Sequence, residues 1–212
     1  MVVLEPHGIA PQPVSQETRV VFESHTMPSW CLKVLRDPTL RPIATPTRQP
    51  KASTEDSFVA ETLATGSTIS TWQSFYKAVP SQQNKQGETL RLSSDSSPVA
   101  GELVTLLALG RGMNGHTNVV HGGLIATILD ETMGMVAGLH QSPGMSAYTA
   151  AVNVSYKKPV PAPGAIVCRT WLEKRSGGRK LWLRGRIEDG EGTLYADAES
   201  LWVEVKRKVP KL

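Results

Sequence analysis

One stretch near the middle of the chain holds residues that could act on a carbonyl group. His121 is followed by Gly122 and Gly123, and Asp130 comes seven residues after Gly123. The glycines open an apolar, helix-forming run, where the first backbone N–H groups lack intrahelical partners and lie at the positive end of the helix dipole. The Gly123 N–H is therefore a candidate donor to a carbonyl oxygen that gains negative charge. Asp130 is a candidate general base or nucleophile.

The spacing of Gly123 and Asp130 predicts that two subunits share each site. Seven helical residues at ~1.5 Å each separate them by about 10 Å, too far for both to contact one small reacting group from a single helix. A two-fold axis between two antiparallel helices would bring Asp130 of one subunit beside Gly123 of the other. A dimer is therefore expected.

The helix that positions these residues is expected to run from residue 122 to about residue 139. On a wheel of ~100° per residue its apolar side chains gather on one broad face. These side chains are Leu124, Ile125, Ile128, Leu129, Met135, Val136 and Leu139. The opposite stripe consists of Gly123, Thr127, Asp130, Gly134 and Gly138. Its small residues would let the sheet, a ligand or a partner helix approach closely.

Strand-like segments lie on both sides of this helix. They are rich in β-branched and aromatic residues or alternate between apolar and polar ones, and the connectors between the later ones have the residues of antiparallel hairpin turns. The segments are residues 67–77, 102–109, 148–158, 165–173, 180–188 and 193–205. They predict an α+β fold, an antiparallel β-sheet wrapped around one long central helix.

The glycine motif and its surroundings resemble the His-Gly-Gly signature of the hotdog-fold thioesterase superfamily. Residues 115–131 carry the signature, and residues 148–161 look like the strand after the helix in the PaaI-like branch that includes human thioesterase superfamily members 4 and 5. Residues 178–180 and 194–198 also fit, and the resemblance covers roughly residues 100–206. It implies the hotdog fold and hydrolysis of an acyl-CoA to the free acid and the CoA thiol. It also implies a homodimer or a dimer of dimers.

The resemblance and the chemistry together assign roles to further residues. Thr149, at the start of the next strand, is expected to position the attacking water, and His121 to hold the preceding turn or to hydrogen-bond near the thioester. The candidate catalytic residues are thus Asp130, Gly123, His121 and Thr149. Candidates for lining the substrate site are Gly122, Asn118 and His116. Charge and hairpin position make Lys157, Lys158 and Arg179 candidate phosphate contacts.

Two other functions fit the same motif. A discrete thioesterase could release an acyl or polyketide chain from a carrier protein, whose acidic surface the basic residues would meet. A non-catalytic acyl-binding module would bind the acyl group without hydrolysis. Lys and Arg outnumber Asp and Glu by only 23 to 19, a net charge of +4, which is too small to imply a nucleic-acid partner.

Cysteine usage and hydropathy narrow the class and the compartment. Cys31 and Cys168 lie far apart, so neither a disulfide framework nor a CxxC metal pair is expected, and Cys168 alternates with apolar strand positions like a core residue. No metal and no cofactor are expected. No apolar run reaches the ~18 residues of a membrane span. A cytoplasmic location is predicted, with a mitochondrial one as the alternative because Arg19 and Lys33 belong to a series of spaced basic residues.

The first sixty residues differ in composition from the rest. Eight of the fifteen prolines lie within the first fifty residues, and proline removes a backbone donor and disfavours helix at the residue before it. Residues 1–60 are therefore predicted to form a proline-rich irregular arm. Residues 61–208 are predicted to form the hotdog domain.

Overall fold

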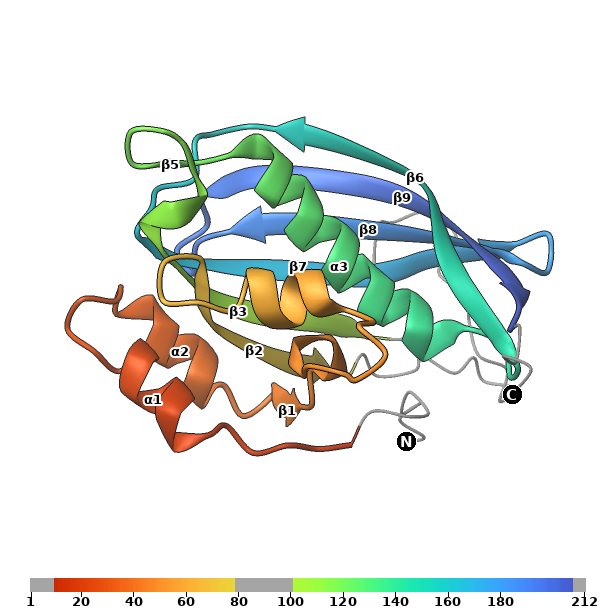
Figure 1. The fold of residues 1–212 in the computed structure, drawn as a ribbon, viewed down its shortest axis with the longest axis horizontal. Coiled ribbons are helices and arrows are strands. Elements are labelled where there is room, and N and C mark those ends of the chain that lie inside the picture. Colours follow the sequence, from red (N-terminus) through yellow and green to blue (C-terminus); the bar gives the residue numbers. More distant parts are fainter. Residues whose placement is uncertain (1–9, 79–100, 208–212) are drawn as a thin grey trace, which may run out of the picture.

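The computed structural model describes residues 10–78 and 101–207 (Figure 1). Its helices are α1 (Gln16–Phe22), α2 (Trp30–Arg36) and α3 (Gly122–His140), with short helical turns η1 (Pro46–Arg48), η2 (Phe58–Thr62) and η3 (Arg111–Met113). Its strands are β1 (Arg41–Ile43), β2 (Ile69–Lys77), β3 (Glu102–Leu109), β4 (Asn114–His116), β5 (Val119–Val120), β6 (Met145–Tyr156), β7 (Gly164–Ser176), β8 (Lys180–Glu188) and β9 (Leu194–Lys206).

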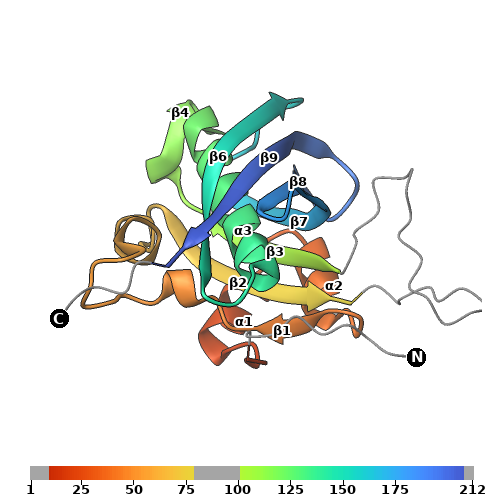
Figure 2. The same ribbon diagram turned by 90° about the vertical axis from the view of Figure 1, so that its right-hand side faces the viewer.

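The long strands form one antiparallel sheet that curves around α3. Within the described residues its seven strands follow the order β1-β2-β3-β7-β8-β9-β6, while β4 and β5 pair separately. Figures 1 and 2 show α3 lying across the concave face, with the strands bending around it on the outside. The predicted antiparallel sheet around one central helix is confirmed.

The two faces of the sheet explain the two kinds of strand sequence. In β7 the residues facing α3 are Ile166, Cys168, Thr170 and Leu172, all buried, as the alternation predicts. By contrast, β3 is covered on both faces and is buried from Leu103 to its end. A strand buried on both faces reads as a continuous apolar run, which is why residues 102–109 show no alternation.

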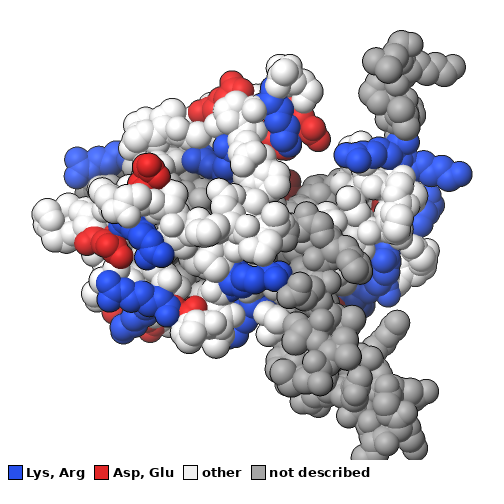
Figure 3. Space-filling view, turned by 90° about the horizontal axis from the view of Figure 1, so that it is seen from below, with Lys and Arg blue, Asp and Glu red and all other residues white. Residues whose placement is uncertain are grey.

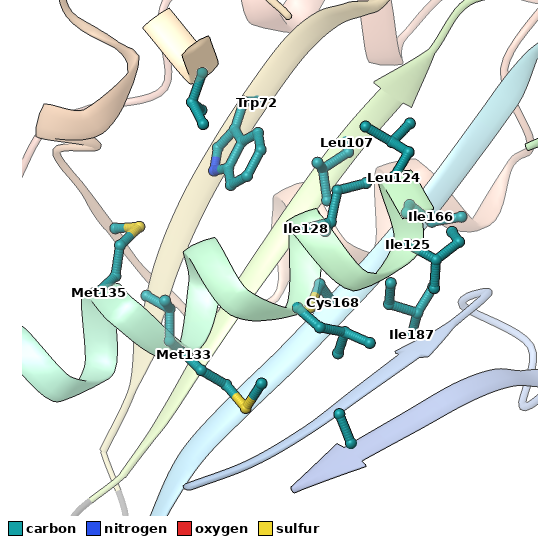
Figure 4. Packing of buried hydrophobic residues seen from close by; sticks show 14 of the residues in the cluster. Trp72, Leu107, Leu124, Ile125, Ile128, Met133, Met135, Ile166, Cys168 and Ile187 are labelled. Atoms are coloured by element: carbon teal, nitrogen blue, oxygen red, sulfur yellow. The ribbon is translucent and has the colours of Figure 1, made fainter. Parts of the chain in front are cut away.

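The main core lies between α3 and the concave face of the sheet (Figure 4). Leu129 and Met133 of α3 are fully buried there, and Cys168 of β7 lies beneath the helix with its Sγ 3.2 Å from the Thr132 hydroxyl. Burial raises the pKa of the Cys168 thiol to about 12. Such a thiol stays protonated, so Cys168 is a core residue rather than a nucleophile.

The chain before β2 contacts both faces of the sheet. Helices α1 and α2 cover the convex face, where Phe22, Trp30 and Cys31 pack in a second core against Phe75 and Leu106. After them β1 pairs with β2, and Figure 1 shows η1 and η2 beside α3 on the concave face. Much of the segment expected to be irregular thus has regular structure. The division of the chain at residue 60 stays a prediction.

Charges are mixed over the face formed by the N-terminal helices. Figure 3 looks at the molecule from below and shows Lys and Arg interspersed with Asp and Glu over its left half, while Lys and Arg gather at the right end. Figure 1 places the turn between β7 and β8 at that end. Positive and negative side chains interspersed in this way are typical of a surface exposed to solvent.

Helix α3 is long and apolar for a reason visible in its packing. Among the described residues it is the helix with the length and composition to cross a membrane, with 19 residues and a mean hydropathy of 1.2. Half of the apolar stretch in this helix is buried inside the molecule, against the sheet. The apolar composition thus matches the demands of a core helix.

Candidate active site

The start of α3 is fixed by the residues of the His-Gly-Gly motif. His121 is the N-cap residue, and its Nδ1 accepts a hydrogen bond from the Gly123 N–H at 2.9 Å. A Cβ on Gly115 of β4 would lie 3.0 Å from the His121 Cα, a tight contact, so glycine suits the close approach of β4 to the start of α3. His121 therefore holds the turn, which is one of its two expected roles. Its Nδ1 also accepts the hydrogen bond of the Gly123 N–H, the group that the sequence predicts to be the oxyanion donor.

Asp130 and Thr149 lie together although 19 residues separate them. The Thr149 hydroxyl, on the edge strand β6, donates a hydrogen bond to Asp130 Oδ1 at 3.0 Å. This contact joins the middle of α3 to the strand that forms the open edge of the sheet. The structure thus brings together two of the candidate catalytic residues.

Burial changes the acidity of the two carboxyl groups on α3. It raises the pKa of Asp130, and the hydrogen bond from Thr149 only partly offsets this. It also raises the pKa of Glu131, where the hydroxyl of Thr47 opposes the effect. A carboxylate with a raised pKa is a stronger base than an exposed one, which is what a general base needs near neutral pH.

Within one protomer the helix keeps Gly123 and Asp130 apart. Both lie on the uninterrupted helix α3, so their seven-residue spacing corresponds to about 10 Å along the axis. The single chain therefore holds the candidate donor and the candidate base at two separate places.

A cavity of about 480 Å³ opens at the N-terminal end of α3. Its lining includes His116, Gly122, Tyr156, Lys157 and Lys158. The Tyr156 hydroxyl donates to the Gly122 carbonyl at 2.9 Å and so ties the end of β6 to the first turn of the helix. Sequence reasoning missed Tyr156, because nothing in the local pattern shows that its hydroxyl reaches back 34 residues.

The candidate phosphate contacts do not form one cluster. Lys157 pairs with Asp197 at 3.1 Å and lies beside Lys158 in this cavity. Arg179 lies in the β7–β8 turn, at the other end of the sheet in Figure 1. One protomer therefore cannot place all three on the same phosphate.

Asn118 has a backbone role that its position in a tight turn explains. It lies between β4 and β5 with φ at +58°, a left-handed conformation that asparagine tolerates better than most residues. Its carbonyl accepts a hydrogen bond from the Ala162 N–H at 3.1 Å. The residue shapes the loop next to the cavity.

A second cavity, of about 560 Å³, lies along the middle and the C-terminal half of α3. Asp130 and Glu131 line it from the helix, and Thr47, Lys51 and Asp56 line it from the N-terminal segment. Sequence reasoning missed these three residues as well, because no periodicity links them to α3. Their approach depends on how the chain before β2 folds back.

Within residues 10–78 and 101–207 no group of three or more His, Cys, Asp or Glu side chains has the arrangement to hold a metal ion.

Known proteins share the part of the chain that forms this site. Residues 117–196 match the family model described as the thioesterase superfamily. Over 108 residues the chain is 39% identical to acyl-coenzyme A thioesterase THEM4 of Mus musculus, covering 50% of this chain and 45% of that protein. It is 38% identical over 109 residues to THEM4 of Rattus norvegicus, covering 51% and 45%. A Candida albicans protein named as uncharacterized and mitochondrial is 30% identical over 88 residues, covering 42% and 39%.

The chain spans about half the length of the curated THEM4 relatives that it matches. The matched segment contains the first turn of α3, Asp130 and Thr149. The antiparallel sheet around α3 is the hotdog fold that the sequence predicts. The part of the chain from residue 117 to residue 196, which contains most of the candidate active site, is thus similar to the thioesterase superfamily.

Proposed function

We propose that the chain hydrolyses an acyl-CoA thioester to the free acid and the CoA thiol. The observation that carries this proposal is the half-buried Asp130 carboxylate, which lines a cavity and accepts a hydrogen bond from Thr149 within the segment that matches the thioesterase superfamily. Two relatives named acyl-coenzyme A thioesterase support CoA as the carrier.

In the proposed reaction Asp130 acts as the general base. A water molecule gives a proton to the Asp130 carboxylate while its oxygen attacks the thioester carbon, and the carbonyl oxygen becomes an oxyanion. The Gly123 N–H of a second copy donates to that oxyanion. The C–S bond then breaks, and the leaving thiolate takes the proton. Thr149 orients the carboxylate.

Direct attack by Asp130 is the alternative route. It would form an enzyme-bound anhydride, which water then hydrolyses. A single turnover in isotopically labelled water tests for this route, because label found in the Asp130 carboxylate shows an anhydride cleaved at the aspartyl carbon. Label in the released acid is expected when Asp130 is the base, and it also arises when water attacks the acyl carbon of the anhydride.

A homodimer would complete the site through strand β6. This 12-residue strand forms an edge of the sheet and contains no Lys, Arg, Asp or Glu. Exposed edge strands are usually protected by charges or prolines, because their free N–H and C=O groups pair readily with another strand. Antiparallel pairing of two copies of β6 would set the two α3 helices antiparallel on one face. Asp130 would then lie beside Gly123 of the second copy.

The proposed oxyanion donor must first exchange its partner. The Gly123 N–H donates to His121 Nδ1 in the free chain, and the His121 side chain is exposed. Rotation of the imidazole about its side-chain torsions would free the N–H for the thioester oxygen. We therefore assign to His121 the role of holding the helix start until substrate replaces it.

Thiol release from a panel of acyl-CoA esters tests the proposed function. The wild-type chain should release thiol, and Asp130→Asn should lower kcat by about 10²–10⁴-fold, the usual contribution of a positioned general base. Turnover by Asp130→Asn at the wild-type rate would contradict the assignment. The same acyl group presented on CoA and on a carrier protein shows which carrier is preferred. Binding of acyl-CoA without thiol release would support the non-catalytic module instead.

We also propose a mitochondrial location, the alternative that the basic N-terminal residues suggest. The Candida albicans relative is named as mitochondrial. Fractionation of cells that express the tagged chain tests this, and recovery in the cytosolic fraction alone would contradict it.

A further inference from the structure

The cavity along α3 begins at the proposed base and continues away from it. Asp130, Gly134 and Gly138 line it at four-residue intervals on the helix, a span of about 12 Å at ~1.5 Å per residue. A Cβ on Gly138 would meet no atom within 4 Å, so this end of the cavity is open to a larger group. A thioester held at Asp130 could therefore extend its acyl chain along the helix.

The two walls of this cavity differ in chemistry. The helix and the sheet contribute Met135, Leu139, Ala147 and Trp202, which suit an acyl chain. The opposite wall comes from the segment of residues 46–56 and includes Thr47, Lys51, Glu55 and Asp56. That segment lies outside residues 117–196, so the family match does not account for it.

The side chain of Arg48 fixes this second wall in place. Its Nη1 donates to the Val59 and Leu63 carbonyls at 2.7 and 3.2 Å, and its Nη2 donates to the Ile69 carbonyl at 2.9 Å. The guanidinium also lies 5.6 Å from the centre of the Trp72 ring. A half-buried arginine with three carbonyl partners holds the segment against η2 and the start of β2.

Acidic groups outnumber basic ones around the cavity. Its lining has four carboxylates, those of Glu55, Asp56, Asp130 and Glu131, and one cation, Lys51. Lys51 is already paired with Asp56 in a short contact and lies 3.9 Å from Glu55. The cavity therefore carries a negative field, which opposes a further negative charge inside it.

We propose that residues 46–56 form the specificity-determining wall of the acyl cavity, which accepts neutral acyl chains and selects against acyl groups that end in a carboxylate. This inference rests on the proposed thioesterase function. It adds a source of selectivity outside the matched segment and names the charge of the acyl terminus as the property selected.

The first experiment tests whether the acyl chain lies along Gly138. In Gly138→Leu the new side chain would fill the open end of the cavity, and leucine is a better helix former than glycine. The ratio of kcat/KM for decanoyl-CoA to that for acetyl-CoA should fall about tenfold. Gly66→Leu is the matched control, because its Cβ also meets no atom within 4 Å and Gly66 lies outside the cavity lining. The control should keep the wild-type ratio.

The second experiment tests the charge of the wall. Asp56 has φ at +62°, which asparagine adopts readily, so Asp56→Asn removes a charge with little backbone strain. The ratio of kcat/KM for glutaryl-CoA to that for pentanoyl-CoA should rise about fivefold. Glu61→Gln makes the same charge change on η2, on an exposed residue outside the cavity lining, and should leave the ratio unchanged.

The outcomes separate this inference from the proposed function. A wild-type chain that releases thiol while Gly138→Leu and Asp56→Asn keep both ratios would overturn the inference alone. A wild-type chain that releases thiol from no acyl-CoA would overturn both. Glu61→Gln could also raise the ratio of kcat/KM for glutaryl-CoA to that for pentanoyl-CoA as much as Asp56→Asn does. This result would show a general effect of net charge and would also overturn the inference.

Discussion

The Thr149 hydroxyl donates a hydrogen bond to Asp130 Oδ1 at 3.0 Å and thereby links the edge strand β6 to the central helix α3. The contact sets the direction of the carboxylate and lowers the pKa that burial raises. It also places the proposed base next to the strand through which we propose that two copies pair.

Removing this hydrogen bond should change the pH dependence of hydrolysis. In Thr149→Val the pKa of Asp130 should rise further, because burial is then unopposed. The acidic limb of the kcat/KM profile should move to higher pH. Thr39→Val is the matched control, because the Thr39 hydroxyl donates to Asp37 at 2.7 Å in a loop away from the site. An unmoved limb in Thr149→Val would argue against Asp130 as the titrating base.

Neutralising Asp130 should stabilise the fold while it removes activity. The pKa of Asp130 is raised in the folded chain, so the folded state binds the proton more tightly than the unfolded state does. The stability that this proton contributes is present at low pH and is lost as the pH rises through the folded pKa. Asp130→Asn should therefore raise Tm at pH 8 more than at pH 5, by about 2–4 °C for each kcal/mol gained. Thermal unfolding at both pH values checks this, and an equal shift at both would contradict it.

Replacing His121 should separate its capping role from direct contact with substrate. Loss of an N-cap side chain costs about 1 kcal/mol, so His121→Ala should lower Tm, and His121→Asn should restore most of it because asparagine caps helices well. Hydrolysis by His121→Asn should stay within about tenfold of wild type. Ser15→Ala, which removes the cap of α1, should lower Tm without changing kcat. A loss of activity in His121→Asn as large as in Asp130→Asn would instead assign His121 to the reaction.

A charge on the open edge should abolish pairing and hydrolysis together. Ala151 is exposed on β6, and Ala151→Lys would place an ammonium group where the second copy is proposed to pair. Sedimentation should show a monomer, and kcat should fall with it. Val20→Lys makes a comparable change on α1, where the side chain is 62% exposed, and should leave the dimer and the activity intact. An active Ala151→Lys monomer would show that one chain suffices for catalysis.

Much of the fold follows from local patterns along the chain. Residues 102–109 and 180–188 have the bounds predicted for them, because burial on two faces and alternation on one face are visible without knowledge of the tertiary structure. The glycines before the apolar run mark the start of α3. The contact between Asp130 and Thr149 could be expected only because the strand that holds Thr149 follows the helix directly along the chain.

The parts that could not be predicted depend on contacts distant in sequence. Lys51 and Asp56 reach the cavity because Arg48 holds their segment against residues that come later in the chain. Tyr156 meets Gly122 for a similar reason. The prolines before residue 50 suggested irregular structure, yet α1 and α2 form because Phe22 and Trp30 bury their rings on the outer face of the sheet.

The two borders of the sheet differ in a way that limits assembly. Strand β1 has three residues, one of them Pro42, and it covers β2 along Ser74 to Tyr76. A border this short, with a residue that has no N–H, is a poor template for another strand, whereas the opposite border is long and free of charges. If two copies pair through β6, as we propose, the border formed by β1 offers no place for a third copy, and assembly stops at two. The residues ahead of β2 would then favour a closed pair of copies over a fibre.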